Sequence, residues 1–324
     1  MNFNNIKEKA LWRMPNTTEI LSIDSQNKGD DRFLIAPFLK DEKVFFVRGK
    51  HTVLEKAETE SFIENTKLKY DISVTSSEND YTNLVNKAIT EINEGKFEKV
   101  VLARQVFIEK EVDVAALFLA LEKKYPNALV FWFVLNNGLS MIGATPETLM
   151  SKTNDTLVIE ALGGTKQTYD YSEKEELEHT QIVKYIKNIL IDHRTQFTIG
   201  EQFSKNAGNL EHLCTPFTVT SRGASLDNDL LKQLHPTSAI CGLPFAVSLK
   251  FIADNEPFKR GYYAGYIGPK LANDDFHFFV NLRSGNLFTN GILLTAGAGI
   301  NSASEAKDEW RETENKIDTI GQCM

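Results

Sequence analysis

The run LVFWFVL at residues 129–135 constrains the fold most, because it has no polar side chain along its whole length. Such a run is typical of a strand covered on both faces, so we predict a central strand between two layers. Residues 99–107 (KVVLARQVF) are rich in β-branched side chains and predict a second central strand. Shorter strand-like runs at 262–267, 276–282 and 291–296 are separated by Gly, Asn and Asp, which indicates antiparallel pairing.

Helical patterns interrupt the strands without alternating with them. Apolar residues recur at helical spacing from Tyr81 to Ile92, and Gly95 follows as a stop. Two longer polar segments, 172–193 and 304–320, also predict helices. Both are opened by the same capping pattern, Ser-x-x-Glu: Ser172 with Glu175, and Ser302 with Glu305.

The 324 residues contain no internal repeat, and their proline and glycine residues are too dispersed to mark a linker. Residues 1–75 carry no chemical motif and are interpreted as a variable scaffold region. Every motif discussed below lies within 80–320. We therefore predict one domain over 1–324.

Composition excludes several classes of function. The net charge of -8 and the absence of a long Lys/Arg run argue against nucleic acid as a partner. The three cysteines, Cys214, Cys241 and Cys323, are scattered and have no Cys-x-x-Cys spacing, so neither a disulfide framework nor a zinc site is indicated. No segment approaches the roughly 18 to 20 apolar residues of a membrane span, so we expect a cytoplasmic protein that does not bind membranes.

Two acidic pairs lie far apart in the sequence: Glu175 with Glu178, and Glu309 with Glu312. The spacing of three residues points both carboxylates of each pair to one face of a helix. If the fold brings the two faces together, the chain has a cage of oxygen ligands that suits Mg²⁺ better than zinc or copper.

Each of these carboxylates also has a structural explanation. Glu175 could reach back to the amide of Ser172 as part of a capping box. Glu178 and Glu309 could simply be solvated, and Glu312 could pair with Lys316 one turn further along the helix. The spacing alone leaves both explanations open.

Four further features could take part in chemistry. Glu147 follows Pro146 and could lie at the rim of a pocket, or in a solvated turn. Lys99 opens an apolar strand, where a lysine can act as a base or can extend to water. Arg283 ends another strand and could bind a carboxylate or form a structural ion pair. The Gly297-Ala-Gly299 turn expected before the last helix could bind an anion or only require positive φ.

Taken together, these motifs resemble those of the chorismate-utilising enzymes. That family includes isochorismate synthase, salicylate synthase, anthranilate synthase component I and aminodeoxychorismate synthase component I. The resemblance covers roughly residues 80–320 in the family's motif order. It rests on Lys99-Val-Val-Leu-Ala-Arg104, Gly143-Ala-Thr-Pro-Glu147, Gly164-Thr165, Ser172-x-x-Glu175-x-x-Glu178-His179, His235-Pro-Thr, Gly297-Ala-Gly299 and Glu309-x-x-Glu312-Thr-x-x-Lys316.

The resemblance implies an α+β fold, an α/β sandwich of two stacked, largely antiparallel sheets with helices on the outside. It also implies a role for each matching position. Glu178 and Glu312 match the direct Mg²⁺ ligands, and Glu175 and Glu309 match supporting, partly water-mediated ones. The positions that bind the substrate carboxylates and the ring are matched by Tyr263, Arg283, Gly297, Gly299 and Lys316, and by Gly164 and Thr165 beneath the ring.

In the same resemblance Lys99 matches the base that activates water, and Glu147 matches the acid that faces the departing hydroxyl. Adding water at ring C2 and expelling the C4 hydroxyl needs a proton acceptor on one side and a proton donor on the other. Lys99 must then be neutral and Glu147 protonated, so we expect burial to lower the pKa of Lys99 and to raise the pKa of Glu147.

Two positions favour an isochorismate synthase without lyase activity. Gly163 stands where aminodeoxychorismate synthases carry a nucleophilic lysine, and Ala239 stands where pyruvate-eliminating members tend to have threonine. The activity expected is Mg²⁺-dependent conversion of chorismate to isochorismate, which menaquinone and siderophore synthesis both consume. We expect a monomer with no obligatory amidotransferase subunit. The alternatives are a salicylate synthase, an anthranilate synthase component I and, more distantly, a non-enzymatic chorismate-binding module.

Overall fold

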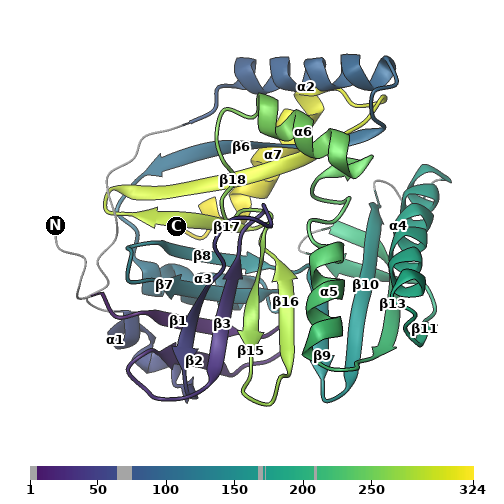
Figure 1. Ribbon diagram of the computed structural model, residues 1–324. Coiled ribbons are helices and arrows are strands. Elements are labelled where there is room, and N and C mark those ends of the chain that lie inside the picture. Colours follow the sequence, from purple (N-terminus) through teal and green to yellow (C-terminus); the bar gives the residue numbers. More distant parts are fainter. Residues whose placement is uncertain (1–5, 64–74, 167–170, 172, 208–209) are drawn as a thin grey trace.

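The computed structural model describes residues 6–63, 75–166, 171, 173–207 and 210–324, and its strands form two large antiparallel sheets (Figure 1). The first sheet has the strand order β14 (Gly242–Leu243), β6 (Lys99–Glu109), β18 (Gly291–Ile300), β17 (Ser284–Phe288), β8 (Ser140–Thr145), β7 (Leu129–Val134), β1 (Lys9–Arg13), β2 (Ile20–Asp24) and β5 (His51–Leu54). The second has the order β11 (Phe197–Ile199), β13 (Leu210–Thr220), β10 (Thr156–Thr165), β9 (Thr148–Thr153), β16 (Phe276–Val280), β15 (Tyr266–Lys270), β3 (Asp31–Ala36) and β4 (Phe45–Gly49), and β12 (Phe203–Ala207) also pairs with β13.

Aromatic side chains pack the two sheets against each other. Phe33 of β3 contacts Trp12 of β1 and Phe131 of β7, with ring centroids 5.2 and 6.3 Å apart. All six residues of β7 are buried, as expected of a strand with a layer on each side. The burial of these rings is the main favourable contribution to holding the sheets together.

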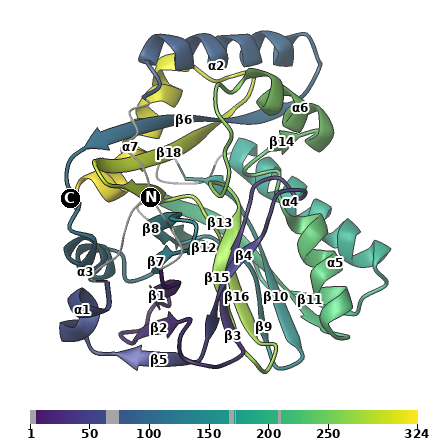
Figure 2. The same cartoon turned by 60° about the vertical axis from the view of Figure 1, so that its left-hand side comes forward.

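Helices cover the outer surfaces (Figures 1 and 2). The helices are α1 (Thr59–Ile63, preceded by a 3₁₀ turn at Lys56–Glu58), α2 (Glu78–Asn93), α3 (Val114–Lys124), α4 (Glu173–Asp192), α5 (Ala224–Leu234), α6 (Phe245–Asn255) and α7 (Ala306–Gly321). Helix α4 packs on β10, and α7 packs on β18 and against α2. The α+β prediction of two stacked antiparallel sheets with outer helices is therefore confirmed.

The N-terminal region contributes to both sheets. Strand β1 pairs with β7 in the first sheet, and β3 pairs with β15 in the second. Within the described residues no helix is both long and apolar enough to cross a bilayer.

Two sequence-based expectations about where an element begins were wrong. The strand expected at 262–267 begins only at Tyr266, because Ala264 adopts positive φ (57°) in a turn that precedes it. Helix α7 begins after Glu305, which has no side-chain cap, so Ser302 does not cap it. The capping role expected of Ser172 falls outside the described residues.

Candidate active site

Two glycines of β18 form the floor of the candidate site. Gly297 and Gly299 are two residues apart, so they face the same side of the strand. A Cβ added at Gly299 would lie 3.2 Å from Cε of Lys99, and one added at Gly297 would lie 3.2 Å from Oη of Tyr263. The missing side chains therefore let a lysine and a tyrosine lie directly on the strand.

The anion-binding turn expected at Gly297-Ala-Gly299 does not exist. Both glycines are inside β18, where Gly297 pairs with Ala103 and Gly299 with Val101 of β6. Strand pairing continues to Ile300, so the turn comes later and the backbone N–H groups do not form an anion site at a helix start.

Lys99 and Glu178 form one ion pair at this floor. Nζ of Lys99 donates a hydrogen bond to Oε1 of Glu178, and the two side chains are 21% and 35% exposed. The start of β6 is fixed by Ser248, whose hydroxyl donates to the carbonyl of Lys99 over 2.8 Å. Helix α4 is fixed by His179, whose Nε2 lies 2.8 Å from Oγ1 of Thr215 on β13.

Lys316 and Glu312 form a second pair beside the first. Nζ of Lys316 donates to Oε1 of Glu312 over 2.6 Å and to the carbonyl of Gly297 over 2.7 Å. Burial lowers the pKa of Lys316, while the charge of Glu312 opposes that shift. The pairing of Glu312 with Lys316 was one of the two explanations left open by the sequence, and it is present here.

Helix α7 is held in place by a buried cation. The guanidinium of Arg104 lies 3.6 Å from the ring centroid of Trp310, and its Nε donates to Oγ1 of Thr313 over 2.6 Å. Trp310 lies between Glu309 and Glu312 in the sequence, so this contact sets the direction in which the acidic face of α7 points.

The acidic faces of α4 and α7 both reach one neighbourhood. The charges of Glu178 and Glu312 both act on His212 of β13, although burial is the main cause that lowers the pKa of His212 to about 4. Glu175 lies over Gly164, where an added Cβ would be 2.6 Å from the Glu175 carbonyl oxygen. The charge of Glu309 contributes, after burial, to raising the pKa of Tyr81.

These carboxylates have the chemistry of a Mg²⁺ site, but they are not arranged as one. No group of three or more His, Cys, Asp or Glu side chains among the described residues is placed to hold a metal ion. Glu178 and Glu312 each accept a hydrogen bond from a lysine instead. The oxygen donors that α4 and α7 contribute fit Mg²⁺ once Glu178 and Glu312 turn away from the lysines.

Cationic and aromatic side chains border the same floor. Arg283 lies at the end of the loop before β17, and burial lowers its pKa, while the negative charges of Glu312 and Glu147 oppose that shift. Burial raises the pKa of Tyr263 to about 12, so its hydroxyl stays protonated. Arg283 and Lys316 together provide local positive charge in a chain of net charge -8.

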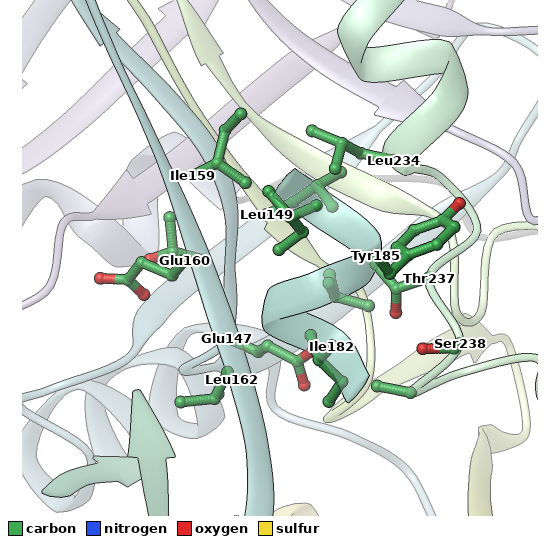
Figure 3. A pocket seen from close by; sticks show the side chains of 14 residues that line it. Glu147, Leu149, Ile159, Glu160, Leu162, Ile182, Tyr185, Leu234, Thr237 and Ser238 are labelled. Carbon is green, nitrogen blue, oxygen red and sulfur yellow. The ribbon is translucent and has the colours of Figure 1, made fainter. Parts of the chain in front are cut away.

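Glu147, in the turn between β8 and β9, lines a separate small cavity enclosed by β9, β10, α4 and the segment after α5 (Figure 3). The cavity measures about 30 Å³, and its lining is mainly apolar, with Leu149, Ile159 and Ile182 among its walls. Burial raises the pKa of Glu147 to about 7, while the charges of Lys316 and Arg283 oppose that shift. The raised pKa expected from the sequence is confirmed, whereas the neutral form expected of Lys99 stays a prediction.

Ala239 lines the Glu147 cavity from the loop between α5 and α6. That loop is tied down by Arg260, which donates to the carbonyl of Ile240 over 2.9 Å and forms an ion pair with Glu256. Position 239 is thus held at the cavity that Glu147 lines.

Gly164 and Thr165 end β10 at a break in its pairing with β13. The register shifts between Gly163 and Thr165, and Gly164 has φ of 69°, a conformation that glycine adopts without strain. Thr165 pairs with His212, but its side chain lies outside the described residues.

Two residues near the site were not among those predicted from the sequence. His212 lies in a short polar stretch of β13 with no recognisable spacing, so only the pairing of β13 with β10 brings it to the site. Ile182 lies one helical turn after Glu178, and that spacing could have indicated it.

Comparison with known proteins agrees with this arrangement. The family model for chorismate binding enzymes matches residues 41–324. Isochorismate synthase MenF of Escherichia coli strain K12 is 32% identical over 252 residues, which cover 73% of this chain and 58% of MenF. Isochorismate synthase EntC of the same strain is 29% identical over 239 residues, which cover 69% of this chain and 61% of EntC.

The chain thus spans about three fifths of the length of these curated relatives. A solved structure of MenF, the menaquinone-specific isochorismate synthase from Escherichia coli, shares the fold. It superposes with a TM-score of 0.77 at 22% identity and covers 99% of this chain and 89% of MenF. Because the family model covers most of the sequence, the chain belongs to the chorismate binding enzymes.

Proposed function

We propose that this chain is an isochorismate synthase, which converts chorismate to isochorismate by adding water at C2 and expelling the C4 hydroxyl. The observation that carries the proposal is the position of Glu147 and Lys99 in adjoining cavities. The Glu147 cavity and the cavity that contains Lys99 share Ile182 and Ser238 as walls. One ring placed at that wall can meet a proton donor on one side and a proton acceptor on the other.

The positive charges of Arg283 and Lys316 support a dianionic substrate such as chorismate. Arg283 and Lys316 are both largely surrounded by protein, where a charge acts through a lower effective dielectric than in water. Arg283 offers a planar pair of donors that matches a carboxylate. We assign Tyr263, Gly297 and Gly299 to the surface on which the substrate carboxylates lie, and Gly164 and Thr165 to the surface beneath the ring.

Glu147 supplies the proton that the departing hydroxyl needs. With a pKa of about 7, about half of its carboxyl groups are protonated near neutral pH, so it can donate where an ordinary glutamate could not. Lys99 takes the proton from the attacking water, which requires that its Nζ leaves Glu178. His212 lies close enough to the ligand carboxylates for their charges to act on it, and burial keeps it neutral at pH 7.

We also propose a Mg²⁺ requirement, with Glu178 and Glu312 as direct ligands and Glu175 and Glu309 in support. The metal ion would neutralise the negative charge of a substrate carboxylate. We expect a monomer that needs no amidotransferase subunit, because the reaction transfers water and no ammonia.

A product assay tests the function. Purified protein with chorismate and MgCl₂ should form isochorismate, detected by chromatography. Pyruvate release, measured with lactate dehydrogenase, would favour the salicylate synthase that Ala239 argues against. Anthranilate formed in the presence of ammonia would overturn the assignment.

Carboxylate variants test the metal site. Glu178→Ala and Glu312→Ala should each lower turnover by about 1000-fold or more and abolish the heat of Mg²⁺ binding in calorimetry, with unchanged circular dichroism. Glu176→Ala and Glu314→Ala are matched controls, because both residues are exposed on the same two helices. A non-catalytic binding module is indicated instead if the protein binds chorismate, forms no product, and responds to neither Mg²⁺ nor Lys99→Ala.

A further inference from the structure

Two cavities meet at one side chain of α4. The cavity with Glu147 measures about 30 Å³, and the cavity with Lys99 and Glu178 measures about 170 Å³. Ile182 and Ser238 line both of them. In Figure 3, Ile182 lies beside Glu147 and Ser238 lies across from it. Ile182 is therefore the apolar part of the wall between the acid and the base.

Ile182 also fills the space that a side chain at position 163 would need. A Cβ added at Gly163 would lie 2.2 Å from Cδ1 of Ile182, with Cγ1 of the same side chain next at 3.6 Å. Atoms that are not bonded do not approach so closely. The backbone of Gly163 does not have the positive φ of Gly164, so its conformation would accept a larger residue. Only the methyl group of Ile182 stands in the way.

We propose that Gly163 and Ile182 form a size-matched pair that positions the substrate ring between Glu147 and Lys99, with Ile182 as a specificity-determining contact. The proposal rests on the function proposed above, because a ring that gains water on one side and loses hydroxyl on the other must touch both cavities. Among the described residues, only Ile182 and Ser238 border both. The ring edge therefore lies against Ile182.

The pairing predicts that the effect of a larger residue at position 163 depends on the size of the side chain at position 182. A methyl group at position 163 pushes Cδ1 of Ile182 towards one of the cavities and reduces the space for the ring. Valine at position 182 lacks Cδ1 and removes the clash. Ile189 of the same helix is a matched control, because it is buried in the core and lines neither cavity.

The experiment measures chorismate affinity by calorimetry with Mg²⁺, and kcat/KM for isochorismate, in five variants. These are Gly163→Ala, Ile182→Val, Ile189→Val and the two double variants that combine Gly163→Ala with each valine. Gly163→Ala should weaken affinity and lower kcat/KM by about tenfold or more, the usual effect of one excess methyl group. Adding Ile182→Val should restore both to within about twofold of Ile182→Val alone, whereas adding Ile189→Val should restore neither. Thermal melts verify that all five fold.

Several results would overturn the pairing. One is an unchanged affinity in Gly163→Ala, and another is an equal loss in both double variants. If wild-type protein binds chorismate without forming isochorismate, the proposed function fails, and the coupling in affinity still decides the pairing. If wild-type protein converts chorismate to isochorismate but Ile182→Val does not rescue Gly163→Ala, only the pairing fails. If chorismate does not bind at all, both fail.

Discussion

The cavities of Lys99 and Glu147 adjoin, yet they differ in size and in the side chains around them. The Lys99 cavity is more than five times larger and includes Glu98, Gln181 and Asn301 in its lining. The Glu147 cavity has room for about one water molecule and is bordered mainly by aliphatic side chains. The lysine is thus placed where water can arrive, and the carboxyl group of Glu147 is placed where water is scarce.

This difference suits the opposite proton-transfer roles that we propose for the two residues. Desolvation favours the neutral form of a carboxyl group, and the small apolar cavity raises the pKa of Glu147 accordingly. Lys99 instead lies against Glu178, which fixes the position of its amine. Exclusion of solvent thus acts on the carboxyl group of Glu147, whereas the ion pair only positions the amine of Lys99, which has to leave Glu178 before it can accept a proton.

Chemical rescue should give the largest contrast between the two cavities. Lys99→Ala and Glu147→Ala should each lower turnover by about 1000-fold, because each removes a proton-transfer group. Ethylamine should raise the turnover of Lys99→Ala about tenfold or more, since the open cavity can admit it. Formate should raise the turnover of Glu147→Ala only slightly. Initial rates with increasing ethylamine or formate measure the effect.

Wild-type protein with the same additives is the control for nonspecific effects of salt. Equal rescue of both variants would contradict the difference in solvent access on which the comparison rests.

Substitution of the two glycines of β18 should give effects of intermediate size, and these should distinguish the Lys99 side of the site from the Tyr263 side. Gly299→Ala places a methyl group against the flexible stem of Lys99, so kcat should fall roughly ten- to a hundredfold with little change in chorismate affinity. Gly297→Ala places a methyl group 3.0 Å from the carbonyl oxygen of Leu102 and close to Tyr263, so affinity should weaken instead. Steady-state kinetics and calorimetry distinguish the two patterns, and identical patterns would show that the sides are not independent.

The first pH unit above neutrality should show the smallest effect on activity. The acid must be protonated, so the activity that depends on Glu147 is fully present well below its pKa of about 7 and is lost as pH rises through that value. We expect kcat/KM to fall about fivefold over the first pH unit above neutrality and roughly tenfold over the next. Glu147→Gln should lose this fall along with most of its activity. A fall that persists in Glu147→Gln would assign it to another group.

Strong local patterns made most of the fold predictable. The apolar run at 129–135 and the β-branched run at 99–107 correspond to β7 and β6, and the expected helix at 172–193 corresponds to α4. The expected strand at 262–267 failed at its start, because the backbone of Ala264 turns there for reasons that its side chain does not reveal. The glycines of β18 were assigned to a turn because nothing in the sequence shows that Ala103 and Val101, which lie within the strand run at 99–107, pair with them.

The sequence by itself determined the residue types of the candidate site: a glutamate after a proline, a lysine at a strand start, two pairs of carboxylates and two further cations in a chain with net negative charge. Their spacing also set which of them share a helix face. Only the tertiary structure decided that Glu178 pairs with Lys99 and Glu312 with Lys316, and that the acid lies in a nearly dry cavity. It alone placed His212 beside them and made Ile182 part of the wall between the two cavities. The reason is that ion pairing and desolvation depend on distances between residues far apart in the chain. The packing of the two sheets and the outer helices sets those distances.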